Sequence, residues 1–196
     1  MMKKQEVIPI SDRKAALRRE MLEVRNALSD AYIAQAGADM QKHLLASPLY
    51  TEADTVFLYV STEKEPGTRL ILRHALAVGK RVCVPKCVNR REMLAVRIRS
   101  LAELAPGRMG IPEPAGGEET IGPEAMDLIA VPCVAASLDG KRLGHGAGYY
   151  DRFLARADSR RAVCLCFQRM LRDDIPMDEH DIWMPAVLTE NGFAER

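Results

Sequence analysis

The residues best suited to chemistry lie in the stretch KRLGHGAGYYDRFL, from position 141 to position 154. Its three glycines alternate with other residues, and glycine lets a backbone approach a ligand closely. A glycine loop that opens into a helix directs several free N–H groups at one point, which favours an anion such as phosphate. Arg142 could add two parallel hydrogen bonds to that anion. Asp151 is an oxygen ligand of the kind that Mg²⁺ prefers.

Glycine spacing by itself does not identify a nucleotide site. No GK[ST] closes the stretch, and its third glycine comes one residue too early for the dinucleotide fingerprint. A glycine-rich turn between a strand and a helix is the alternative. The complete string is far more specific, because RLGxGxGYYDRFL resembles the signature of the 5-formyltetrahydrofolate cyclo-ligase family. In that family the loop holds ATP and borders the folate, and its aspartate helps to bind magnesium.

Two basic residues near the N-terminus extend this pattern. Lys14 and Arg18 lie four residues apart, so on a helix they share a face and could hold one anion together. A solvated basic face is the alternative interpretation of such a pair. The segment Lys14-Ala-Ala-Leu-Arg18 resembles the KxxLR element of the family, which contacts ATP phosphates. Together with the glycine loop, this resemblance favours the functional interpretation.

A polar loop, STEKEPGT at positions 61–68, follows a predicted strand. The carboxyl end of a strand is the usual ligand edge of an open α/β sheet. The loop resembles the S-x-x-x-E-x-x-T element of the family, in which the glutamate (Glu65 here) faces the folate. The residue that matches Val60 lines the same pocket. Without this resemblance, a Glu65 that decorates a surface turn would be the preferred interpretation.

The segment from Ile175 to Pro185 resembles the P-x-E-x-H-D close of the family. The last aspartate of that motif helps to hold magnesium, and it corresponds to Asp181, for which Asp151 would be the partner. His180 by itself is more typical of a structural hydrogen bond than of a catalyst.

The resemblance covers positions 14–190 and implies a role for each matching residue. The ATP site comprises Lys14, Arg18, Arg142, Leu143, Gly144, His145, Gly146, Ala147, Gly148, Tyr149 and Tyr150. The folate site comprises Val60, Glu65, His145, Gly146, Ala147, Gly148 and Tyr149. The metal ligands are Asp151 and Asp181, and the catalytic residues are Arg142 and Tyr149.

Several positions depart from the family pattern. After the strand that precedes the glycine loop, relatives read close to V-P-G-x-A-F-D, whereas this chain has Cys133, Ala136 and Ser137 at the glycine, phenylalanine and aspartate positions. His145 and Ala147 also differ from the residues common in relatives. These changes bear on substrate preference more than on ATP binding.

Two helices are expected before the first strand. Ser11 can cap a helix that begins at Asp12 or Arg13, with an apolar stripe formed by Leu17, Met21, Val24 and Leu28. Ser29 then starts a second helix, which ends before Pro48.

Strands and helices alternate over the rest of the chain. Strand 55–60, helix 68–78 and strand 80–85 form a βαβ unit, which implies parallel strands and a right-handed crossover. Further strands are expected at 93–98, 127–132, 161–167 and 187–189. A helix is expected over 150–156 and an exposed loop over 115–123. The segment from Leu101 to Pro114 resembles the helix-then-GIPEP segment of the family, which implies a further helix after position 101. The predicted fold is α/β: a single three-layer domain, residues 1–196, with a mostly parallel central sheet flanked by helices.

Composition excludes several classes of protein. The chain has 196 residues, a net charge of +1 and 47% hydrophobic residues, which is ordinary for a soluble domain. No apolar run approaches the roughly 20 residues of a membrane span, and no signal peptide is evident. The five cysteines mostly fall in predicted strands, so buried free thiols are expected rather than metal ligands or disulfides.

A basic stretch from Lys86 to Ser100 carries one lysine and four arginines against a single acid, Glu92. It could attract nucleic acid, but no aromatic residues are interleaved to stack bases. The glutamate tail of a folate is a better candidate, and a solvated surface is the default.

The resemblance implies the ATP- and Mg²⁺-dependent closure of 5-formyltetrahydrofolate to 5,10-methenyltetrahydrofolate, with release of ADP and phosphate. The expected partners are these small molecules, without nucleic acid or membrane, and a monomer in the cytoplasm is expected. Two alternatives stay open: a paralogue that binds nucleotide or folate without turnover, and a nucleic-acid-binding module built on the basic stretch.

Overall fold

The computed structural model describes residues 8–107, 110–116 and 119–194 of the chain. In these residues the central sheet has eight strands in the order β12-β11-β10-β7-β1-β2-β3-β6. The strands from β11 to β2 run parallel, and β12, β3 and β6 pair antiparallel at the two ends. The bounds in chain order are β1 (Thr55–Phe57), β2 (Arg81–Cys87), β3 (Met93–Ile98), β6 (Thr120–Ile121), β7 (Leu128–Pro132), β10 (Ala162–Leu165), β11 (Ala186–Thr189) and β12 (Gly192–Phe193).

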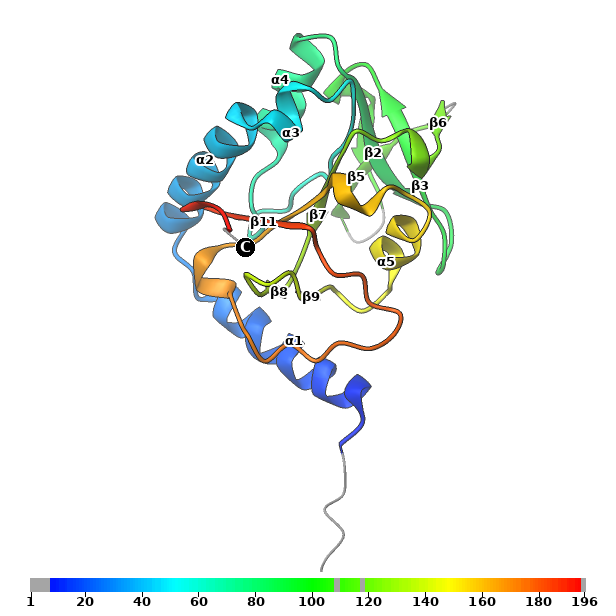
Figure 1. Ribbon diagram of the computed structural model, residues 1–196. Helices are drawn as coiled ribbons and strands as arrows, with labels where there is room; N and C mark the ends of the chain where they lie inside the picture. Colours follow the sequence, from blue (N-terminus) through cyan, green and yellow to red (C-terminus); the bar gives the residue numbers. More distant parts are fainter. Residues whose placement is uncertain (1–7, 108–109, 117–118, 195–196) are drawn as a thin grey trace, which may run out of the picture.

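Helices cover both faces of this sheet. In Figure 1, α2 (Asp30–Ala46), α3 (Pro48–Thr51) and α4 (Arg69–Ala77) lie on one side, and α5 (Tyr149–Leu154) lies on the other. The ring of Phe57 in β1 stacks on Phe153 of α5 with centroids 4.5 Å apart, which fixes α5 to its face. The predicted α/β fold with a mostly parallel, helix-flanked sheet is confirmed. None of the helices in the described residues is long and apolar enough to cross a membrane.

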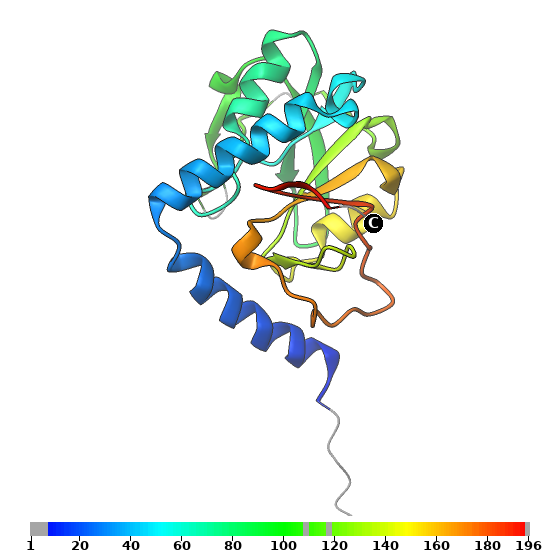
Figure 2. The ribbon, with the colours of Figure 1, turned by 60° about the vertical axis from the view of Figure 1, so that its left-hand side comes forward.

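The first helix, α1 (Ile10–Asn26), lies apart from the other helices and reaches α2 through a bend, as Figure 2 shows. It begins earlier than predicted. Pro9 precedes its first turn and accepts backbone hydrogen bonds from Asp12 and Arg13, both at 3.1 Å. The fixed φ of proline suits this position. Ser11 lies inside the helix and caps nothing, so that prediction is wrong.

The predicted apolar stripe of α1 is confirmed in two of its four positions, Leu17 and Met21, which are buried. Leu28 is also buried but lies beyond the end of the helix at Asn26, and Val24 is 37% exposed. The cap of α2 is also as predicted, because the Ser29 hydroxyl accepts a hydrogen bond from the Tyr32 backbone N–H at 3.2 Å.

The predicted βαβ unit is confirmed, with β1 parallel to β2 and α4 between them. Strand β1 nevertheless ends at Phe57 rather than at Val60. The Thr68 side chain takes the place of a neighbouring strand there. Its hydroxyl donates to the Tyr59 carbonyl at 2.5 Å and accepts from the Ser61 backbone N–H at 3.1 Å.

Two small hairpins stand outside the main sheet. β4 (Leu104–Pro106) pairs with β5 (Pro112–Pro114), and β8 (Ala135–Ala136) pairs with β9 (Arg142–Leu143). The first hairpin corrects the expected helix after position 101, of which one 3-10 turn (Leu101–Glu103) forms. Prolines at the hairpin ends are poor helix formers, which accounts for the difference.

The loop expected over 115–123 contains β6, paired with β3, although residues 117–118 lie outside the described part. The strand expected to be final is followed by β12, and β11 and β12 form a hairpin.

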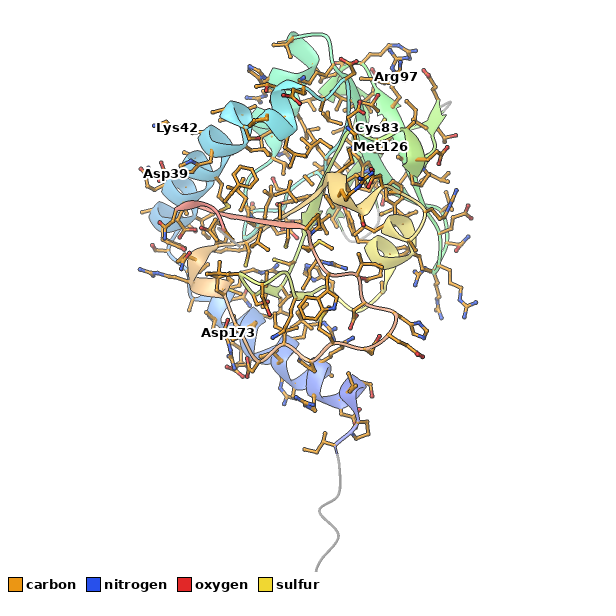
Figure 3. All side chains as sticks on the ribbon, in the orientation of Figure 1. Asp39, Lys42, Cys83, Arg97, Met126 and Asp173 are labelled. Carbon is orange, nitrogen blue, oxygen red and sulfur yellow. The ribbon has the colours of Figure 1, made fainter. Side chains whose placement is uncertain are left out.

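The core fills the space between sheet and helices. The parallel strands β7 and β10 are buried at almost every position, as is typical of strands covered on both faces. Figure 3 shows Cys83 and Met126 inside the molecule and Asp39 and Lys42 at its rim. None of the five cysteines forms a disulfide; four of them are buried, and Cys87 is half-buried. Burial raises the pKa of Cys83 to about 12, which suits an inert thiol.

Candidate functional site

The β8–β9 hairpin brings the chain into the glycine loop, which runs from Gly144 to Gly148 and opens into α5. Gly146 and Gly148 have φ angles of +99° and +67°, in the left-handed region that favours glycine. Gly148 immediately precedes the first turn of α5. The predicted glycine loop that opens into a helix is therefore present.

The guanidinium of Arg142 lies behind this loop, with its side chain 4% exposed. It donates hydrogen bonds to Asp151 Oδ1 at 2.7 Å and to the Pro132 carbonyl at 3.3 Å. Burial by itself lowers the pKa of Arg142, but the Asp151 carboxylate outweighs this effect and raises it. A Cβ on Gly144 would lie 2.8 Å from Arg142 Nη1, so the guanidinium supports the loop backbone directly.

Helix α1 lies against the same loop through the face that carries Lys14 and Arg18. Arg18 Nε donates to the Gly144 carbonyl at 2.8 Å, and a Cβ on Gly146 would lie 3.3 Å from Arg18 Cζ. Lys14 donates to Asp178 at 2.6 Å and also to Asp181. The structure thus brings both predicted phosphate-binding cations together with the glycine loop and the C-terminal segment.

Burial acts on the pKa of both cations, but the net shifts have opposite directions. It lowers the pKa of Arg18. It also lowers the pKa of Lys14, but the hydrogen bonds to Asp178 and Asp181 outweigh burial and raise it. Asp178 was not assigned from the sequence, although it lies only three residues before Asp181 in the same motif.

The two predicted metal ligands lie on adjoining segments. Asp151 Oδ1 accepts from Arg142 and, at 3.5 Å, from the Ile182 backbone N–H. Asp181 Oδ2 accepts from Lys14 and from the Asp178 backbone N–H at 2.7 Å. Within the described part of the chain, these bonds use one oxygen of each carboxylate and leave Asp151 Oδ2 and Asp181 Oδ1 for a ligand.

The described residues contain no group of three or more His, Cys, Asp or Glu arranged around one ion position. Two carboxylates with an oxygen to spare on each fit a Mg²⁺ ion that also takes phosphate oxygens and water, because Mg²⁺ keeps several waters and commonly uses one or two carboxylates. The donor set therefore fits magnesium bound together with a phosphate.

Glu65 is 9% exposed and lies where the loop 61–68 meets the glycine loop. Its Oε2 accepts from the backbone N–H and the hydroxyl of Thr62, at 2.9 and 3.0 Å. Its Oε1 lies 3.6 Å from His145 Nε2. Burial raises the pKa of Glu65, but hydrogen bonds from His145 and Thr62 outweigh it and lower the pKa. Two residues that were assigned to the folate are thus in contact.

The two tyrosines after the glycine loop differ in their surroundings. Tyr149 is half-buried and donates from its hydroxyl to the Asn89 carbonyl at 2.6 Å. The Tyr150 hydroxyl is buried and has no hydrogen-bond partner among the described residues. Burial, and then the negative charge of Glu65, raises the pKa of Tyr150. Tyr150 was assigned to ATP, yet its hydroxyl is affected by the charge of Glu65, which was assigned to the folate.

Helix α5, which follows the glycine loop, also contacts the tip of the β2–β3 hairpin. Besides Tyr149, Arg152 donates to the Arg91 carbonyl at 2.7 Å and to the Ala147 carbonyl at 2.8 Å. These contacts were not predicted. They end on backbone carbonyls, so no side-chain pattern in the hairpin signals them.

Ser137 and two arginines of the basic stretch, which the sequence singled out, form side-chain hydrogen bonds or ion pairs in the structure. Ser137 is buried; its hydroxyl donates to Asp139 and accepts from the Lys141 backbone N–H at 2.9 Å, which fixes the turn between β8 and β9. In the basic stretch, Arg97 and Arg99 both pair with Glu119, at 3.0 and 3.2 Å. That pairing reduces the positive charge available to an acidic ligand.

A groove of about 460 Å³ lies beside α1, between the side chains of Arg13, Glu20, Arg172 and Asp174. Arg172 pairs there with both Glu20 and Asp174. The groove contains none of the predicted site residues, and its charges neutralise one another.

Comparisons with known proteins identify the family of this chain. Residues 10–190 match the model of the 5-formyltetrahydrofolate cyclo-ligase family. A 5-formyltetrahydrofolate cyclo-ligase of Mycolicibacterium smegmatis is 34% identical over 185 residues, which cover 90% of this chain and 93% of the relative. The enzyme of that name from Mus musculus is 28% identical and covers 95% and 98%.

Solved structures of 5,10-methenyltetrahydrofolate synthetases have a similar fold. The NMR structure of Aquifex aeolicus 5,10-methenyltetrahydrofolate synthetase has a TM-score of 0.82 and 32% identity, over 92% of this chain and 91% of that chain. A 5,10-methenyltetrahydrofolate synthetase from Mycoplasma pneumoniae has a TM-score of 0.73 over 90% and 98%, and at 21% identity it supports the fold alone.

Proposed function

The chain belongs to the 5-formyltetrahydrofolate cyclo-ligase family, and on this premise we propose that it closes 5-formyltetrahydrofolate to 5,10-methenyltetrahydrofolate with ATP, releasing ADP and phosphate. The observation that supports this most directly is the convergence on one loop: Arg18 bonds the Gly144 carbonyl, and Glu65 meets His145. A cation suited to a phosphate and a carboxylate suited to a folate thus contact the same glycine loop.

The reaction needs activation because an amide oxygen is a poor leaving group. The formyl oxygen first attacks the γ-phosphorus of ATP, and the bond to ADP breaks. N10 then attacks the activated carbon and loses its proton, and phosphate departs with the former formyl oxygen. Phosphoryl transfer depends mainly on positioning and charge stabilisation. No protein nucleophile is required, which agrees with the burial of four of the five thiols.

Each predicted residue has a part in this scheme. Arg18 and the backbone from Gly144 to Gly148 bind the phosphates, and Lys14 adds charge at the same face of α1. Arg142 holds the loop backbone in place from behind, and Tyr149 fixes the neighbouring hairpin tip. Asp151 and Asp181 would hold Mg²⁺, which supplies charge neutralisation at the phosphates when bound. Val60, Glu65 and His145 bind the folate.

The remaining assignments follow from the same scheme. We propose a single domain over residues 1–196, working as a monomer in the cytoplasm on small-molecule substrates, without nucleic acid or membrane. The pairing of Arg97 and Arg99 with Glu119 supports the exclusion of nucleic acid, because it weakens the basic stretch.

The decisive experiment mixes the purified protein with Mg-ATP and 5-formyltetrahydrofolate and follows the near-ultraviolet absorbance of the methenyl product. Product and phosphate are expected in equal amounts, and phosphate release should require the formyl folate. ATP hydrolysis at the same rate with and without folate would exclude the cyclo-ligase reaction.

A further inference from the structure

The tip of the β2–β3 hairpin, residues 88–92, projects beyond the last paired residues of its two strands. Each residue of the tip is exposed, so burial does not hold it in place. Its internal shape comes from Asn89, whose side chain accepts from two backbone N–H groups of the tip at 2.8 and 3.0 Å. Figure 1 shows α5 beside this end of the hairpin. Hydrogen bonds to the tip from other parts of the described chain come from two side chains of α5, Tyr149 and Arg152.

The guanidinium of Arg152 joins the tip to the glycine loop. Its Nε donates to the Arg91 carbonyl at 2.7 Å, and its Nη2 donates to the Ala147 carbonyl at 2.8 Å. The Tyr149 ring lies against the same group, with its centroid 5.4 Å from Cζ, which is within the range of a cation–π contact. One planar group therefore contacts the hairpin, the loop and a tyrosine that the sequence assigned both to catalysis and to the folate.

The bond to Ala147 fixes the orientation of a peptide group in the glycine loop. The peptide between Ala147 and Gly148 is trans, like all those that the structure describes, so its C=O and N–H point in opposite directions. Because the Ala147 carbonyl faces Arg152, the Gly148 N–H is turned to the other side, where no described residue accepts from it. That N–H is free to bind a phosphate oxygen.

Glycine makes this peptide easy to turn over. Gly148 has a φ of +67°, and glycine adopts positive and negative φ about equally readily, so the peptide could rotate at little steric cost. The guanidinium lies close to the same backbone, since a Cβ on Gly148 would be 2.7 Å from Arg152 Nη1. The loop thus needs glycine to let the guanidinium approach, and it needs the guanidinium to keep one conformation.

Asp151 and Arg152 are neighbours in the chain but face different segments. Asp151 accepts from Arg142 and from the Ile182 backbone N–H, whereas Arg152 bonds the tip and the loop. The reaction scheme gives Arg152 no part. Arg152 is also exposed, and exposed polar contacts contribute little to stability, so orienting the loop accounts for its contacts better than holding the fold together.

We propose that Arg152 is a positioning residue for the reaction. Its guanidinium holds the peptide between Ala147 and Gly148 with the Gly148 N–H directed at the phosphates of ATP, and it joins the loop to the hairpin tip so that Tyr149 keeps its place. The assignment rests on the proposed function and adds to it a residue that acts through the loop and Tyr149 rather than on a substrate.

Two substitutions separate the planar donors from the positive charge. Arg152→Ala should lower kcat/KM for Mg-ATP roughly tenfold, the lower end of the range for a hydrogen bond to a charged group. Arg152→Lys should lose nearly as much, because lysine keeps the charge but cannot hold two carbonyls in one plane. Arg156→Ala is the matched control and should keep the wild-type rate, since Arg156 is exposed four residues later and its side chain bonds no residue that the structure describes.

A rescue experiment distinguishes this positioning role from a contribution to the fold. Because Arg152 is exposed, free guanidinium ions can reach the space that Arg152→Ala leaves. Millimolar guanidinium chloride should restore part of the rate, since the ion has the same planar donors, and ammonium chloride at the same concentration should not. Thermal unfolding of Arg152→Ala should stay close to that of the wild-type protein.

The tip itself supplies a measurement that needs no activity. It contains Arg90 and Arg91, after which trypsin cleaves, and proteolysis requires a segment that can open locally. Arg152→Ala should be cleaved at the tip several-fold faster than the wild-type protein. Arg156→Ala, which also lacks one arginine, should be cleaved there at the wild-type rate. Mass spectrometry of the fragments identifies the cleavage at the tip.

Three results would overturn the proposal: a wild-type rate in Arg152→Lys, a loss of rate in Arg152→Ala that guanidinium does not restore and that accompanies a lower Tm, or equal cleavage of the tip in Arg152→Ala and Arg156→Ala. A wild-type protein that forms no methenyl product would be a failure of the proposed function instead. Proteolysis would still test the contact of Arg152 with the tip, so the two failures are distinguishable.

Discussion

At the scale of single residues, the two oxygens of Glu65 have different surroundings. Oε2 accepts a hydrogen bond from the backbone N–H of Thr62 in the same loop, whereas Oε1 faces His145 and is the oxygen available to a substrate. Glu65→Gln should therefore raise the folate KM by about 10- to 150-fold, the range for a charge-assisted hydrogen bond. Nucleotide affinity measured without folate should stay the same, and Glu63→Gln, an exposed neighbour, is the control.

The same substitution has a pH-dependent effect on stability. Because the folded protein lowers the pKa of Glu65, its ionised form stabilises the fold above the unfolded pKa of about 4.3, and this contribution is lost as pH falls through the folded value. Urea unfolding should show a deficit for Glu65→Gln near neutral pH that shrinks below about pH 4.3. A deficit that does not change with pH would exclude the charge of Glu65 as its cause.

The sequence singled out segments that the structure brings together at the glycine loop, but it could not orient every side chain. Arg142 stands beside the glycine loop in the sequence, which suggested a fork on phosphate, yet its guanidinium is buried behind the loop against Asp151. Tyr150 likewise follows the loop directly, while burial and then the charge of Glu65 raise the pKa of its hydroxyl. Side-chain direction depends on packing from distant segments, which local spacing does not encode.

At the scale of elements, two serines that both precede or begin a helical pattern in the sequence have different roles in the structure: one caps a helix and the other does not. Ser29 caps α2 through the Tyr32 backbone N–H, whereas Ser11 lies inside α1 and bonds its neighbour Asp12. Ser29→Ala should reduce the free energy of unfolding by about 1 kcal/mol, or roughly 2–4 °C in Tm for a chain of this size. Ser11→Ala should change neither quantity measurably. Equal losses in the two variants would contradict the assignment of the caps.

Elements with strong burial patterns were predicted well, and those held by local turns were not. The strands 93–98 and 127–132 and the βαβ unit follow from apolar runs and their spacing. Strand β12 was missed although the pair Asn191-Gly192 is a common hairpin signal; the turn itself lies at Glu190 and Asn191, because Thr189 pairs with Gly192. The β4–β5 hairpin was missed because its residues are mostly half-buried and rich in proline, so neither helical nor alternating periodicity marks it.

At the scale of the whole molecule, the glycine loop joins segments from both ends of the chain. Lys14 and Arg18 of α1 contact the C-terminal segment and the loop, respectively, and the backbone of Ile182 contacts Asp151. A ligand that binds only the folded protein at this junction stabilises it by an amount that grows with the logarithm of the ligand concentration relative to its Kd. At 100 times its Kd, Mg-ATP should add about 2.7 kcal/mol, a rise in Tm of roughly 5–10 °C.

The choice of carboxylate decides whether the magnesium dependence of this shift can be measured. Asp151→Asn would leave the buried Arg142 without its carboxylate, at a cost of about 3–5 kcal/mol, so instability would obscure any effect on the metal. Asp181→Asn leaves Lys14 paired with Asp178 and is the better variant.

Asp181→Asn should lose most of the Mg²⁺-dependent part of the rise in Tm that ATP gives, and it should keep the rise given by ATP without metal. Asp178→Asn, which also removes a partner of Lys14 but was not predicted to bind metal, should keep both parts. If the two variants lose the Mg²⁺-dependent part equally, the segment serves to position Lys14, and Asp181 is not a metal ligand.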